Sequence, residues 1–398
     1  MALKRKIIEP SEPILSFEHQ SIIPGPEPKS RFIPVCRPTL VGNELKYVED
    51  CVKTGWISSI GENISKFEKM FAEAVGAKYA VSTTNGTTAL HLAVHTLGIG
   101  PGDEVIVPTF TMIATANAVR YTGARPVLVD SEPRTWNIDP DKIEEKITEK
   151  TKAIMPIHTY GHPADMDKIN ALADKYNLWV IEDAAEAHGA LYKGKKIGSI
   201  GDIACFSFYA NKIITTGEGG MATTNDEEIY QKMKNIRSHA FSTERHFWHK
   251  YLGFNYRLTN LQAAVGVAQM ERFEELVESR IKNARLYNSY LKDIKGIILP
   301  PETQNVKNVY WMYSIKLTSE FPISRDELRD RLMDRGIETR TFFIPMNLQP
   351  TYYNEWKDEK FPIAEDLCKT GLYLPSSSDL TEEEIKYVVE NLAEIAKR

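Results

Sequence analysis

Short apolar segments and amphipathic helical segments alternate along residues 79–224, and few folds accommodate that order. The helical segments at 87–98 and 166–177 place apolar residues on one face. The strand segments are mostly apolar, as in strands that are buried on both faces. They are 79–84, 104–108, 125–130, 153–158, 178–183, 204–208 and 219–224. The order predicts an α/β fold with a mostly parallel seven-stranded sheet between helices. Because a long loop without a helix joins the last two segments, we expect at least one antiparallel strand.

The regular alternation of strands and helices does not extend to the residues before 79 or after about 265. Prolines at 24–30 exclude a regular helix or a central strand at the end of the first 30 residues. After about residue 265, isolated helices and strands follow one another. They are a long polar helix at 269–294, a strand at 309–317, a helix at 324–336, the segment IETRTFF at 337–343 and a final helix from Thr381. We therefore predict a flexible or surface-draped extension at 1–30, a large α/β domain at 31–265, and a connector helix with a smaller C-terminal α+β domain at 266–398.

The composition argues against several classes of partner. The 398 residues carry a net charge of −5, so no overall basic field favours nucleic acid or an anionic membrane. No apolar run reaches the ~18–20 residues of a membrane span, and the N-terminus lacks the apolar core of a signal peptide. The cysteines are scattered without metal-ligand spacing, which predicts reduced thiols, no metal site and a cytoplasmic location. They are Cys36, Cys51, Cys205 and Cys368.

Three short polar segments follow three of the predicted strands. The first, at 85–88, reads Asn-Gly-Thr-Thr and opens a helix, where free N–H groups favour a phosphate. An ordinary helix cap explains that segment equally well. In the second, Asp183 ends an apolar strand and needs a partner, which a cationic ring nitrogen, an arginine or a helix N-terminus would supply.

The third segment contains Ser207 and Lys212, between an apolar strand and a glycine-rich turn. A desolvated lysine can bond to an aldehyde, whereas most lysines are solvated surface residues. Ser207 can donate to a phosphate. Because ligands lie at the carboxyl ends of strands in doubly wound folds, we expect the three segments to form one site. His158 and His162, at a strand–loop junction, are expected to be structural.

Together these segments match the requirements of pyridoxal 5'-phosphate (PLP). This cofactor requires a phosphate cup, a carboxylate opposite its pyridine nitrogen and a lysine for its aldehyde. The carboxylate keeps the ring nitrogen protonated, so that the ring withdraws electrons. The lysine then moves a proton between the amine carbon and the cofactor. The sequence therefore predicts a PLP enzyme.

The same residues resemble those of the DegT/DnrJ/EryC1/StrS family of sugar-nucleotide aminotransferases, which have the PLP aminotransferase fold type I. The resemblance covers about residues 32–398. Its specific strings are NGTTALHLA (85–93), GIGPGDEVIVPTFT (98–111), EDAAEA (182–187), FSFYANKIITTGEGGM (206–221) and GFNYRLTNLQAA (253–264).

The resemblance implies a role for each residue of the cofactor site. Lys212 would bond to the cofactor aldehyde and serve as the catalytic acid and base. Asp183 would pair with the pyridine nitrogen, and Gly86, Thr87 and Ser207 would hold the phosphate.

Other positions follow from the same resemblance. Glu186 would lie beside the cofactor hydroxyl, where many relatives have Gln. Asn255 would reach the cofactor phosphate of a neighbouring subunit, which implies a homodimer with shared active sites. Met112 departs from the aromatic residue that many relatives place over the ring. The candidates for substrate binding are Trp56, Ser58, Arg245 and Trp248 for the sugar nucleotide and Arg257 for a substrate carboxylate.

The implied reaction moves the amino group of L-glutamate to C4 of a nucleotide-linked 4-keto-6-deoxy sugar. Glu186 resembles the branch that converts GDP-4-keto-6-deoxymannose to GDP-perosamine, a step of polysaccharide (O-antigen) biosynthesis. A UDP- or dTDP-linked keto sugar stays open as the substrate. A related PLP-dependent sugar dehydratase carries His at the lysine position, and a non-catalytic regulatory relative should have lost the lysine, so Lys212 favours amine transfer. A dehydrogenase is disfavoured because no G-x-G-x-x-G follows the first strand.

Overall fold

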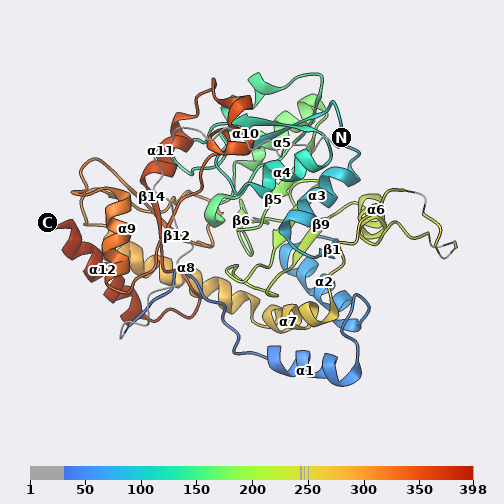
Figure 1. The fold of residues 1–398 in the computed structure, drawn as a ribbon, viewed down its shortest axis with the longest axis horizontal. Helices are drawn as coiled ribbons and strands as arrows, with labels where there is room; N and C mark the ends of the chain where they lie inside the picture. Colours follow the sequence, from blue (N-terminus) through green and yellow to red (C-terminus); the bar gives the residue numbers. More distant parts are fainter. Residues whose placement is uncertain (1–30, 243, 246, 250, 398) are drawn as a thin grey trace, which may run out of the picture.

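The computed structural model describes residues 31–242, 244–245, 247–249 and 251–397, so the predicted extension at 1–30 lies outside the described residues. A seven-stranded sheet of order β1-β9-β8-β5-β4-β2-β3 forms its centre (Figure 1). The strands are β1 (Tyr79–Thr83), β2 (Glu104–Pro108), β3 (Arg125–Val129), β4 (Thr151–Ile154), β5 (Trp179–Asp183), β8 (Ile203–Ser207) and β9 (Gly220–Thr224). Only the pairings of β9, with β1 and β8, are antiparallel. The predicted α/β sheet is confirmed, and β9 is its antiparallel strand.

Helices cover this sheet through apolar faces. All five residues of β2 are buried, as expected of a strand between two layers. α5 buries Met166, Ile169 and Ala173 on the predicted stripe, and α3 packs on β8 and β9. The helices up to residue 270 are α1 (Glu44–Thr54), α2 (Glu62–Val75), α3 (Gly86–Thr96), α4 (Ala114–Tyr121), α5 (Met166–Tyr176), α6 (Glu227–Arg237) and α7 (Asn260–Met270). Short 3-10 turns lie at Pro140–Lys142, Glu144–Lys146, Thr159–Gly161 and Met346–Leu348.

A second, antiparallel sheet has the order β10-β12-β14-β13. Its strands are β10 (Ile297–Ile298), β12 (Tyr313–Leu317), β13 (Arg340–Thr341) and β14 (Gly371–Leu374). The helices of this part are α8 (Phe273–Leu291), α9 (Arg325–Asp334), α10 (Pro350–Trp356), α11 (Pro362–Thr370) and α12 (Glu382–Ala396). Three strands of two residues each form a small three-stranded sheet: β6 (Leu191–Tyr192), β7 (Lys195–Lys196) and β11 (Val306–Lys307). α8 packs against α12, and in Figure 1 α9 and α12 lie at the opposite end of the molecule from α6.

Several predicted boundaries in the C-terminal part differ from the structure. The predicted helix at 269–294 is interrupted at Glu271 and Arg272, where Asn43 and Tyr47 bind the Glu271 carboxylate at 2.7 and 2.6 Å. The predicted strand at 309–317 begins only at Tyr313. Its extended course is blocked at Tyr310, which has a φ of 47°.

The division into a large and a small domain stays a prediction. Its boundary between residues 265 and 266 lies inside α7 (Asn260–Met270), which packs on α1 and α2. Within the part of the chain that the structure describes, no helix has both the length and the apolarity to cross a bilayer.

Candidate active site

A cavity of about 610 Å³ opens at the carboxyl edge of the seven-stranded sheet. One wall comes from the ends of β1, β5 and β8, and the other includes Arg340 and Thr341 of β13. Six residues predicted for the cofactor site line this cavity together: Gly86, Thr87, Asp183, Glu186, Ser207 and Lys212. The structure thus brings segments that are more than 120 positions apart in the sequence to one place, as the strand order required.

The first turn of α3 forms one end of the cavity. Asn85 caps this helix, because its side chain accepts from the Thr88 amide at 2.9 Å while the Thr88 hydroxyl accepts from the Asn85 amide at 3.1 Å. A Cβ on Gly86 would lie 2.8 Å from Cβ of Ser207, so only glycine allows this close approach. The free N–H groups of the turn and the Ser207 hydroxyl form a cup that suits a phosphate.

Asp183 ends β5 and is buried. Its carboxylate accepts hydrogen bonds from the Thr115 hydroxyl at 2.7 Å and from the Ala185 amide at 3.2 Å. Burial nevertheless raises the pKa of Asp183 above its ordinary value, because these contacts and the Lys212 charge compensate the lost hydration only in part. A cationic group in the cavity would stabilise the ionised carboxylate further.

Lys212 lies in the turn that follows β8, where its amide donates to the Tyr209 carbonyl at 2.9 Å. Its Nζ lies 3.6 Å from the centre of the Trp311 ring. Burial lowers the pKa of Lys212 below its ordinary value, although the carboxylates of Glu186 and Asp183 oppose this change. A lysine with a lowered pKa is more often a neutral amine, which is the nucleophilic and basic form.

Glu186 is buried beside this lysine. Burial raises the pKa of Glu186 to about 7, while the positive charge of Lys212 and the Tyr160 amide act in the other direction. That amide donates to Glu186 Oε2 at 2.7 Å. The backbone of Tyr160 lies in the left-handed region, with a φ of 55°, which is an uncommon conformation for a large residue. The backbone here is held in a costly conformation that presents a donor to the carboxylate.

Six further predicted residues do not line the cavity of their own chain: Asn255, Trp56, Ser58, Arg245, Trp248 and Arg257. Asn255, Trp56 and Trp248 are exposed. Arg245 lies over the Trp248 ring at 5.6 Å, and Arg257 donates to the Ser238 hydroxyl at 3.2 Å. Their predicted roles, that of Asn255 at the cofactor phosphate of a neighbouring subunit and those of the other five at the substrate, stay predictions.

One part of the cavity comes from the C-terminal region and could not be predicted from the sequence. Trp311, Arg340, Phe343 and Tyr373 line it. Trp311 also donates from Nε1 to the Asn211 carbonyl at 2.9 Å, which ties this wall to the lysine turn. No local pattern marks these residues, because only the packing of the C-terminal part over the sheet brings them to the site. Met112, which departs from the aromatic residue of many relatives, also lines the cavity and is 52% exposed.

The donor set fits PLP. The cup formed by Gly86 and Ser207 accepts a phosphate, the buried Asp183 carboxylate matches a protonated ring nitrogen, and the Lys212 amine is available for an aldehyde. The close approach at Gly86 brings the first turn of α3 against Ser207, so that both can face the same phosphate.

Comparisons with known proteins agree with this chemistry. The model of the DegT/DnrJ/EryC1/StrS aminotransferase family matches residues 38–393. The chain is 47% identical over 366 residues to GDP-perosamine synthase of Escherichia coli O157:H7, covering 92% of this chain and 98% of that protein. It is 49% identical over 364 residues to GDP-perosamine synthase of Caulobacter vibrioides, covering 91% and 98%. The PLP-form structure of Spr1654 from Streptococcus pneumoniae is 28% identical with a TM-score of 0.86, covering 92% of this chain and 99% of that chain.

Proposed function

Because this chain belongs to the DegT/DnrJ/EryC1/StrS aminotransferase family, we propose that it transfers the amino group of L-glutamate to C4 of GDP-4-keto-6-deoxymannose and so forms GDP-perosamine. The chain is a PLP-dependent sugar-nucleotide aminotransferase. The identity of 47–49% to two GDP-perosamine synthases supports the choice of sugar. The observation that carries the proposal is the presence of Lys212 and Asp183 in one cavity with an anion cup.

Each residue of the cavity has a separate task in this reaction. Gly86, Thr87 and Ser207 would hold the phosphate and thereby fix the position of the ring. Asp183, ionised, would keep the proton on the ring nitrogen. When bound, PLP supplies a ring that accepts the electrons released as a proton leaves the amine carbon. Lys212, with its lowered pKa, takes that proton and returns it to the adjacent carbon, so the same amine serves both half-reactions.

The amino donor needs a cation for its carboxylate groups. Among the described residues that line the cavity, Lys212 and Arg340 are the basic ones. Arg340 lies on β13 and donates to Glu338 at 3.3 Å. The Arg340 side chain is 59% exposed, so it also contacts solvent. We therefore assign the donor carboxylate to Arg340, in addition to the predicted Arg257, which is bound to Ser238 in its own chain.

A homodimer with shared active sites is part of the proposal. Large apolar side chains are exposed on α1 and on the segment that follows it, among them Leu45 at 81%, Val52 at 63% and Ile60 at 68%. Exposed apolar patches of this kind mark interfaces. The predicted reach of Asn255 to the cofactor phosphate of a neighbouring subunit is consistent with its exposure and its position outside the cavity of its own chain. The cytoplasmic location, inferred from four free cysteines, stays a prediction.

The test separates the two half-reactions. The PLP-loaded protein is treated with L-glutamate, and the loss of the aldehyde form of the cofactor is followed by absorbance. GDP-4-keto-6-deoxymannose and its UDP- and dTDP-linked counterparts are then added separately, and the amino sugar is detected by mass. We expect the GDP-linked sugar to restore the absorbance fastest. A protein that accepts the amine but transfers it to none of these sugars would refute the proposal.

A further inference from the structure

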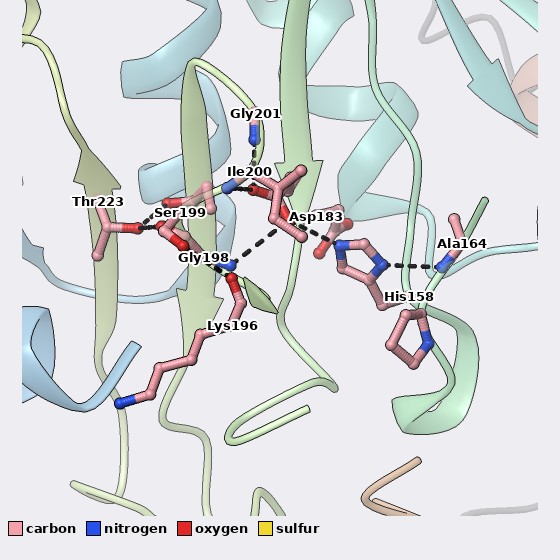
Figure 2. A network of polar contacts seen from close by, with 12 residues as sticks. His158, Ala164, Asp183, Lys196, Gly198, Ser199, Ile200, Gly201 and Thr223 are labelled. Atoms are coloured by element: carbon pink, nitrogen blue, oxygen red, sulfur yellow. Dashed lines mark hydrogen bonds and ion pairs between the residues drawn. The ribbon is translucent and has the colours of Figure 1, made fainter. Parts of the chain in front are cut away.

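Glu182 and His158 form a fully buried pair behind the cavity, and neither side chain contacts the space where the cofactor would bind. Both are 0% exposed, and His158 Nε2 lies 3.1 Å from Glu182 Oε2. Glu182 also accepts three backbone amides of the loop before β8, from Gly198 at 3.4 Å, Ile200 at 3.1 Å and Gly201 at 2.8 Å. Figure 2 shows His158 on one side of β5 and the 198–201 loop on the other.

The hydrogen bonds around His158 and Glu182 show which atoms of the pair carry a proton. The Ala164 amide donates to His158 Nδ1 at 3.1 Å, so Nδ1 carries no proton and the ring proton lies on Nε2. His158 is therefore a neutral donor to Glu182. The Glu182 carboxylate receives four N–H donors, two on each oxygen, which is the pattern of an ionised acceptor.

The same residues hold the strand ends on which the cofactor residues stand. The His158 amide donates to the Asp183 carbonyl at 3.2 Å, and the Asp183 amide donates to the Pro156 carbonyl at 2.8 Å. On the other side, β5 pairs with β8, with Asp183 opposite Cys205, two residues before Ser207. Glu182 thus connects the chain after β4, the end of β5 and the loop that leads into β8. The Thr223 hydroxyl extends the connection to β9 by donating to the Gly198 carbonyl at 2.7 Å.

We propose that the His158–Glu182 pair is a positioning device that fixes the spacing between Asp183, which faces the ring nitrogen, and Ser207, which faces the phosphate. The proposal rests on the proposed function only in that the chain binds PLP. A rigid cofactor that is held at both ends binds tightly only if the two ends of its site are already correctly spaced. Loosening the pair should weaken cofactor binding although no residue in contact with the cofactor has changed.

Glu182→Gln is the sharpest perturbation. Each carboxylate oxygen faces two N–H donors, so either orientation of the amide places its NH2 group against two other donors. His158 cannot adapt by moving its proton, because Nδ1 already faces the Ala164 amide. We expect the dissociation constant of PLP to rise about tenfold or more, the consequence of leaving buried donors unsatisfied. The pH titration of the bound cofactor's absorbance should also shift.

Asp202→Asn is the matched control, because it makes the same chemical change near the other end of β5. Asp202 accepts the Val180 amide at 2.8 Å through one oxygen, which the amide of Asn retains. We expect PLP affinity within about twofold of wild type for this variant, since its donors stay satisfied.

Substitutions of His158 test the same idea when Glu182→Gln folds poorly. His158→Gln places an N–H donor near the position of Nε2 and should keep PLP affinity close to wild type, whereas His158→Leu removes the donor and should weaken binding. Thermal unfolding of the cofactor-free variants is measured alongside. If Glu182→Gln and His158→Leu lower the unfolding temperature but bind PLP with unchanged affinity and titration, the pair is only structural and the proposal is wrong. A wild-type protein that binds PLP but aminates no sugar would refute the proposed function and leave this proposal intact.

Discussion

The replacement of Glu186 by Gln should change how the stability of the cofactor-free protein depends on pH. Burial raises the pKa of Glu186 from the ordinary 4.5 to about 7. An acid whose pKa is raised by folding holds its proton more tightly in the folded state. Its contribution to stability is therefore complete below pH 4.5 and is lost as the pH rises through 7. A difference from 4.5 to about 7 corresponds to about 3 kcal/mol, most of which is lost between pH 5 and pH 8.

The glutamine side chain of the variant would not titrate, and its oxygen can still accept the Tyr160 amide. We therefore expect the free energy of unfolding of Glu186→Gln to rise relative to wild type by about 2 to 3 kcal/mol between pH 5 and pH 8. Lys212 loses the opposing charge of Glu186 in the variant, so its pKa is lowered further, which makes stability rise with pH in the same direction. Urea unfolding of both cofactor-free proteins across this pH range gives the measurement. A difference between the two proteins that stays constant with pH would refute the raised pKa of Glu186.

Three further outcomes follow from the cavity. Lys212→Ala should retain PLP without a covalent bond and lose turnover in both half-reactions, which absorbance and product mass will show. Gly86→Ala should weaken PLP binding about tenfold or more, because the new Cβ would lie 2.8 Å from Cβ of Ser207 and overpacking costs roughly 1–3 kcal/mol. Gly100→Ala is the control, because the nearest atom to its Cβ would lie 3.7 Å away. Arg340→Met should raise the L-glutamate concentration needed for the first half-reaction about tenfold or more, because a charged hydrogen bond to the donor carboxylate is lost. PLP affinity should stay unchanged. Equal glutamate dependence in the variant and wild type would exclude Arg340 as the residue that binds the amino donor.

The central sheet was predictable from the sequence because its strands are buried on both faces. A strand such as β2 must be apolar at nearly every position, and the predicted and observed bounds of 104–108 coincide. β4 was placed about two residues late, at 153–158 instead of Thr151–Ile154, because the apolar run continues past the end of the continuous strand to the isolated bridge of Ile157 with Asp183. Apolar character marks burial, whereas the hydrogen-bonded end of a strand depends on its neighbours.

The site was predictable only in part, for a related reason. Asp183, Ser207 and Lys212 stand at or just after strand ends, where a polar residue after an apolar run is a local signal. Arg340 stands on a strand of two residues whose position is set by packing against β14. Its neighbours in sequence do not distinguish it from a solvated arginine. His158 was expected to be structural, and among the described residues its two ring nitrogens contact Glu182 and the Ala164 amide. Its connection to Asp183 follows from three-dimensional contacts alone.

The cavity combines two buried carboxylates with one half-buried lysine, and the loss of hydration acts on all three in the direction of the neutral form. It raises the pKa of Asp183 and Glu186 and lowers that of Lys212. Each of these changes costs folding free energy at neutral pH, because the charged forms have lost hydration that the protein replaces only in part. The same changes bring the lysine and Glu186 closer to neutrality, where a group can both accept and release a proton. A protein selected for stability alone would not keep three such groups in one cavity, so the gain in stability expected for Glu186→Gln at high pH should come with slower amine transfer.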